Sequence, residues 1–133
     1  MGPVVETLVL DSEGLSAWIA QDRKVTAVLE AFDGSGTEFV VGANTVIEAA
    51  HAGTSIPRLN RLLSRVKVET VTEESAKAAA RLLKDAGLHG RKYAIDATVA
   101  EMALRQPGPV VMMTSDLDDM ARLCGDRIRL LSV

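Results

Sequence analysis

Four acidic residues of this sequence have the type and placement expected of ligands for a divalent metal ion. Asp11 directly follows a short apolar run, and Asp116 follows another after only two residues. Glu48 and Asp96 each lie near the start of a predicted helix, within strongly apolar sequence. Carboxylate oxygens are the ligands that Mg²⁺ and Mn²⁺ prefer. A metal held by these residues would lower the pKa of a bound water and stabilise the oxygen that leaves a phosphodiester.

Each acid also has a purely structural explanation. Asp11 and Asp116 could cap the helices that follow them, Thr45 and Glu48 match a capping box, and Asp96 could complement a helix dipole. Taken together these explanations are weaker, because no Lys or Arg lies within three residues of Asp11, Glu48 or Asp116. Carboxylates that meet without a basic partner repel one another. A divalent cation would remove that repulsion, so metal binding is the better interpretation.

The elements that must position these acids alternate along the chain between short apolar runs and helical patterns. Strands are predicted at 7–10, 39–41, 66–71, 109–113 and 128–131. Helices are predicted at 12–21, 25–32, 44–52, from Pro57, at 72–87, 94–105 and 117–124. This alternation predicts an α/β fold, a three-layer α/β/α sandwich with a mostly parallel central sheet. The length of 133 residues fits a single domain over 1–133.

This architecture brings the acids together. Ligands of an open α/β sheet bind beyond the carboxyl ends of the strands. Asp11 and Asp116 follow strands directly, and Glu48 lies in the helix leaving the second strand. If the helix that contains Asp96 packs antiparallel to the strands, its N-terminus lies at the same edge. We therefore expect all four carboxylates at one edge of the sheet.

Four segments at these positions, taken in order, resemble the PIN-domain nucleases and, more narrowly, the VapC toxins of bacterial toxin–antitoxin pairs. The segments are Leu8–Ser12, Asn44–Glu48, Tyr93–Ala97 and Thr114–Asp118. The resemblance covers essentially the whole chain. It implies a Mg²⁺- or Mn²⁺-dependent endoribonuclease in which the four acids hold the metal.

The resemblance also implies roles for two further residues and for two partners. Thr114 would supply a hydroxyl of the fourth motif and contact substrate, and Asp118 would be an auxiliary metal ligand. The chain would form a homodimer, and a VapB-type antitoxin would block the site with its C-terminal segment.

Basic residues are concentrated in one part of the chain. Residues 56–92 contain nine Lys and Arg and four Asp and Glu, although the whole chain has a net charge of −3. Arg91 and Lys92 lie just before Asp96, so we expect them to contact RNA phosphates near the site. The i, i+3, i+7 spacing of Arg58, Arg61 and Arg65 predicts a second basic stripe. A solvated helical surface would explain the same pattern.

Composition excludes several other classes of protein. Aromatic residues make up 3% of the chain, too few for a platform on which RNA bases stack. The single cysteine, Cys124, excludes an intrachain disulfide and a cysteine-rich zinc site, and its apolar surroundings predict burial. No apolar run is long enough to span a membrane, and the first residues lack the basic region of a signal peptide. We therefore expect a cytoplasmic protein.

Two other functions remain open. Leu8–Gly14 is similar to the first motif of haloacid-dehalogenase-type phosphatases, but that motif has a second Asp where this chain has Glu13. A phosphatase of that type also gives Glu48 no role. Alternatively, the chain could be a non-catalytic PIN-like module that binds RNA or protein.

Overall fold

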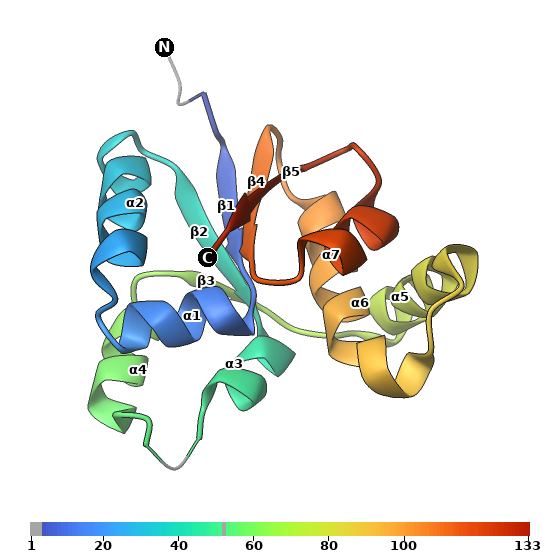
Figure 1. Ribbon diagram of the computed structural model, residues 1–133, viewed down its shortest axis with the longest axis horizontal. Helices are drawn as coiled ribbons and strands as arrows, with labels where there is room; N and C mark the ends of the chain where they lie inside the picture. The colour runs from blue at the N-terminus through green and yellow to red at the C-terminus, as the bar shows by residue number, and fades with distance from the viewer. Residues whose placement is uncertain (1–3, 52) are drawn as a thin grey trace.

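The computed structural model describes residues 4–51 and 53–133, and its elements match the predicted alternation (Figure 1). The strands are β1 (Thr7–Leu10), β2 (Glu38–Gly42), β3 (Lys67–Glu69), β4 (Val110–Thr114) and β5 (Arg129–Ser132). The helices are α1 (Ser12–Ile19), α2 (Arg23–Gly34), α3 (Ala43–Ala49), α4 (Ile56–Leu63), α5 (Glu73–Ala86), α6 (Gly90–Arg105) and α7 (Leu117–Cys124).

The five strands form one sheet in the order β3-β2-β1-β4-β5. All four strand pairs are parallel, with Leu10 opposite Val41 of β2 on one side and Met113 of β4 on the other. Helices cover both faces, as a parallel sheet requires. Figure 1 shows α1, α2 and α4 on one side of the sheet and α5, α6 and α7 on the other. The predicted three-layer α/β/α fold is confirmed.

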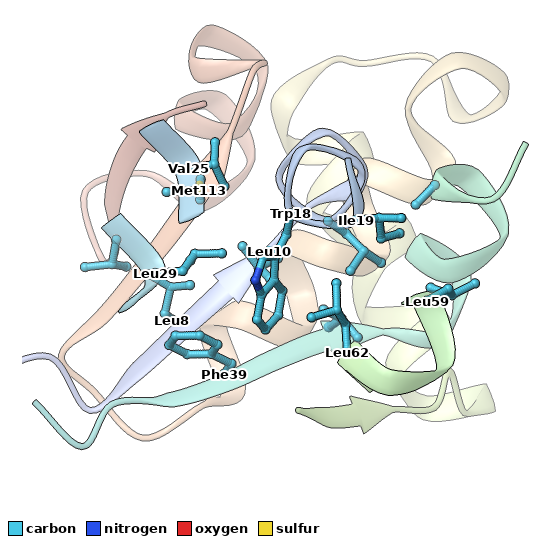
Figure 2. Packing of buried hydrophobic residues seen from close by; sticks show 14 residues of the cluster. Leu8, Leu10, Trp18, Ile19, Val25, Leu29, Phe39, Leu59, Leu62 and Met113 are labelled. Atoms are coloured by element: carbon cyan, nitrogen blue, oxygen red, sulfur yellow. The ribbon is translucent and has the colours of Figure 1, made fainter. Parts of the chain in front are cut away.

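Successive residues of each strand point to opposite faces, so the sheet separates two hydrophobic cores. On one face Leu8, Leu10 and Phe39 pack against Trp18 and Leu29 of α1 and α2 (Figure 2). On the other face Val9, Val40 and Met112 pack against α6 and α7. Cys124 belongs to this second core, where burial raises the pKa of its thiol to about 11. A protonated thiol enclosed in apolar packing is unreactive.

The element boundaries differ from the prediction mainly at α6 and β3. Helix α6 begins at Gly90, four residues earlier than expected. Gly87 ends α5 with a left-handed φ of 67°, and the N–H of Tyr93 already donates to the carbonyl of His89. The chain therefore re-enters a helix within three residues of the turn. Strand β3 has only three residues, because its neighbour β2 pairs with Lys67–Glu69 alone. Residue 52, the predicted end of α3, lies outside the described residues.

Helices long and apolar enough to cross a bilayer are absent from residues 4–51 and 53–133.

Candidate active site

Two of the predicted ligands follow adjacent parallel strands. Asp11 comes directly after β1, and Asp116 comes two residues after β4. These strands pair with Leu10 opposite Met113, so the two acids leave the sheet at the same edge. Because β1 continues on one side to β2 and on the other to β4, the order of strands reverses here. Such a reversal is where open α/β sheets bind ligands.

Asp11 is held rigidly. Its side chain is 3% exposed and accepts the N–H of Gly14 at 2.9 Å, which caps helix α1. Burial raises the pKa of Asp11, and the charge of Asp116 raises it further. Hydrogen bonds from the Thr114 hydroxyl and from the N–H groups of Gly14 and Ser115 act in the opposite direction. The capping role is therefore real, and it fixes one face of the carboxylate.

Asp96 receives the negative field of the other acids. The residue lies in the second turn of α6, not the first, so the predicted dipole explanation weakens. Burial raises the pKa of Asp96 to about 6, and the charges of Asp116, Glu48, Asp11 and Asp119 raise it in that order. The structure thus brings the four predicted carboxylates within electrostatic range of one another.

Glu48 has no structural role of the kind considered from the sequence. Helix α3 begins after Gly42, whose position as N-cap lacks a side-chain hydrogen bond. Thr45 lies inside the helix and is fully buried, so the capping-box interpretation of Thr45 and Glu48 is wrong. Glu48 lies in the second turn and is exposed. Its carboxylate acts on Asp96 from the helix after β2.

Helix α7 contributes a different second acid from the one predicted. Asp116 occupies its N-cap position, but its side chain makes no capping hydrogen bond. Asp118 is exposed and is not among the charges that act on Asp96. Asp119 is, because residues three apart share a helix face and Asp119 therefore lies on the side of Asp116. The i, i+3 spacing of Asp116 and Asp119 was the signal in the sequence.

These acids suit a hard divalent cation, although they do not form a closed cage. Within the described ranges 4–51 and 53–133, no three acidic, histidine or cysteine side chains are gathered closely enough to hold a metal ion by themselves. Mg²⁺ commonly binds through one or two carboxylates together with water and substrate phosphates. An acidic site with one buried, fixed carboxylate and several exposed ones therefore fits such an ion.

The predicted basic residues fall into two groups. Arg91 and Lys92 lie exposed in the first turn of α6, and Lys92 precedes Asp96 by four residues, which places both on one helix face. The Lys92 ammonium also lies 5.2 Å from the centre of the Tyr93 ring. These two residues are next to the acidic edge.

The arginines of α4 are placed elsewhere. Arg58 donates to the carbonyl of Ile19 at 2.8 Å, and the Arg65 guanidinium lies 5.8 Å from the Trp18 ring centre. With Arg61 they line a cavity between α1, α2 and α4 that contains none of the carboxylates. Two of the three are therefore engaged within the fold. The apolar residues considered for a partner groove are mostly core, since Leu15, Trp18, Leu59 and Leu62 are all buried.

Comparison with known protein families decides the assignment. The family model of the PIN domain matches residues 8–125. The chain belongs to the PIN-domain family. PIN domains are nucleases that generally use divalent metal ions, so the family match favours a nuclease over the phosphatase alternative. Asp11, Glu48, Asp96, Asp116 and Asp119 all lie inside the matched region.

The fold of this PIN domain is also found among solved structures. It is similar to a chain in the crystal structure of VapBC2 from Rickettsia felis bound to a DNA fragment from their promoter, with a TM-score of 0.69 and 14% identity. The alignment covers 96% of this PIN domain and 98% of that chain. None of the curated proteins compared with it matches.

Proposed function

We propose that this PIN domain is an endoribonuclease that requires Mg²⁺ or Mn²⁺, with Asp11, Glu48, Asp96 and Asp116 as the metal ligands. The observation that carries the proposal is the shared field at Asp96, whose pKa is raised by three other predicted ligands. Carboxylates from β1, α3, α6 and the end of β4 meet there. The energetic cost of gathering them is explained if a cation occupies the site.

The side chains divide the work. Asp11 offers a fixed, pre-oriented oxygen, while exposed Glu48 and Asp116 are free to adjust to a cation and to a phosphate. Asp96 needs a cation nearby to ionise fully near neutral pH. When bound, the metal supplies an activated water as nucleophile and stabilises the leaving oxygen. Asp119 adds negative charge at the same edge, and it replaces Asp118 as the preferred auxiliary acid.

Arg91 and Lys92 are proposed to bind the RNA backbone. Both are exposed at the start of the helix that contains Asp96. Cationic side chains at this distance from the reacting phosphate position the substrate without reading its sequence. They would also offset the repulsion between RNA and the acidic edge.

We further propose that the nuclease is the toxin of a toxin–antitoxin pair, acts as a homodimer and is blocked by a VapB-type antitoxin. Its fold is shared with a chain of a VapBC2 complex. Ile47, next to Glu48 on α3, is 73% exposed, as expected of a residue that a partner protein covers. Expressing the wild type and Asp96→Asn in a bacterial host tests this: growth should stop only with the wild type, whereas equal arrest would favour a non-catalytic module.

The nuclease activity can be tested against the alternative enzyme class directly. Purified protein is incubated with total bacterial RNA and, separately, with p-nitrophenyl phosphate, each in Mn²⁺ or in EDTA. We expect RNA fragments only in Mn²⁺, with new 5′ ends at defined positions, and no release of nitrophenol. Release of nitrophenol that is lost in Asp11→Asn, without RNA fragments, would replace the nuclease with a phosphatase.

A further inference from the structure

Thr114 differs from the role that the resemblance implied for it. A residue that contacts substrate needs some accessible surface, but Thr114 is fully buried at the end of β4. Its hydroxyl oxygen accepts the N–H of Asp116 at 3.0 Å. Since that oxygen is already an acceptor, its proton is available for donation, and the hydroxyl acts as a hydrogen-bond donor to the Asp11 carboxylate.

The Thr114 side chain therefore connects two of the proposed ligands. One hydrogen bond reaches the acid after β1, and the other holds the backbone of the acid after β4. The Thr114 backbone is also fixed, because its carbonyl accepts the N–H of Val133 at 3.1 Å. No part of the residue is left to reach an RNA molecule.

We infer that Thr114 is a positioning residue, which sets the orientation of the Asp11 carboxylate and its spacing from Asp116, and that it does not contact RNA. The inference rests on the proposed metal-dependent function. Hydrogen-bond partners of ligating side chains orient those ligands, and removing one typically costs about 10–100-fold in metal affinity or activity. Loss of a substrate contact would instead weaken RNA binding.

The test compares Thr114→Val with a matched variant, Thr7→Val. Thr7 is also a buried threonine of the sheet, 2% exposed, and its hydroxyl donates to the carbonyl of Pro107 at 2.8 Å. It lies at the start of β1, at the edge opposite the carboxylates. Both substitutions place a methyl group where a buried hydroxyl was, so their effects on stability should be similar. Thr114→Ser keeps the hydroxyl and serves as the conservative variant.

Two quantities are measured: Mn²⁺ affinity without RNA, from the electron paramagnetic resonance signal of free Mn²⁺, and the kcat and KM of RNA cleavage. We expect Thr114→Val to weaken Mn²⁺ binding and to lower kcat, each by about 10–100-fold, with KM for RNA within about twofold. Thr114→Ser should recover both quantities to within about threefold, and Thr7→Val should retain both.

Each other outcome contradicts the inference in a distinguishable way. If Thr114→Val matches Thr7→Val in Mn²⁺ affinity and kcat, or changes KM alone, Thr114 does not position ligands, while the nuclease proposal stands. If the wild type binds Mn²⁺ but cleaves no RNA, the nuclease proposal fails, and the ratio of Mn²⁺ affinities still decides the role of Thr114. If the wild type binds no Mn²⁺, both are overturned.

Discussion

Replacing Asp96 by Asn is expected to abolish RNA cleavage and, at the same time, to make the metal-free protein more stable. The two effects have one cause. Asp96 is half-buried among like charges, which raises its pKa to about 6. Above that pH the folded protein holds a charge that the unfolded chain accommodates more easily. The Asp96→Asn substitution removes the charge with little change in volume, so we expect a gain of about 1–2 kcal/mol after allowance for solvent screening.

The pH dependence follows from the direction of the shift. The folded-state pKa lies above the value of 3.8 for an unperturbed Asp. The wild type therefore loses stability relative to Asp96→Asn as pH rises from about 4 to 6. The difference in melting temperature should be largest above pH 6 and should fade toward pH 4. A variant less stable than the wild type at pH 7.5 in EDTA would contradict the shared field at this site.

Divalent metal should reverse the order of stability. A cation that binds only the folded state stabilises it in proportion to the logarithm of its concentration over Kd. Adding Mn²⁺ at pH 7.5 should raise the melting temperature of the wild type and leave that of Asp96→Asn almost unchanged. Asp33→Asn is a suitable control, because Asp33 is an exposed acid in the last turn of α2, before β2 begins.

Asp11 should respond differently to Ala and to Asn. Alanine leaves three donors without their acceptor: the N–H groups of Gly14 and Ser115 and the Thr114 hydroxyl. Loss of a helix cap costs about 0.5–2 kcal/mol, and a buried unsatisfied donor costs about 1–3 kcal/mol. Relief of the buried charge offsets part of this, so we expect Asp11→Ala to lose about 1–3 kcal/mol in urea unfolding.

Asp11→Asn should keep nearly all of the stability and still lose activity. The amide oxygen continues to accept the cap from Gly14, but a neutral amide is a poor ligand for Mg²⁺. Both Asp11 variants should therefore cleave RNA at least about 100-fold more slowly than the wild type. Asp22→Ala is the matched control, because Asp22 caps α2 through Val25 at 2.9 Å and lies far from the acids in the chain. Normal stability of Asp11→Ala would show that these hydrogen bonds contribute little.

Most of the fold could be predicted from local patterns. Four consecutive buried residues form β1, and the alternation of such runs with amphipathic stretches was enough to predict a parallel sheet covered on both faces. The start of α6 could not be predicted in this way, since Gly90 is a weak helix former. The helix begins there because the turn at Gly87 and the packing of α6 against α5 set the direction of the chain.

The candidate site was predicted in outline, but its contacts were not. The order and spacing of Asp11, Glu48, Asp96 and Asp116 were sufficient to place them at one edge of the sheet. The hydrogen bonds of Thr114 depend on the pairing of β1 with β4, which joins residues about a hundred positions apart. The preference for Asp119 over Asp118 depends on where α7 begins, because one residue of shift turns the side chain away from Asp96.

The most direct test of the metal-dependent nuclease is the rate of RNA cleavage as a function of Mn²⁺ concentration, for the wild type, Asp96→Asn and Asp33→Asn. We predict that the wild type and Asp33→Asn reach the same maximum rate at the same Mn²⁺ concentration and are inactive in EDTA. Asp96→Asn should be at least about 100-fold slower at every concentration. Cleavage by the wild type in EDTA, or a normal Mn²⁺ dependence in Asp96→Asn, would contradict a metal-dependent nuclease built on these carboxylates.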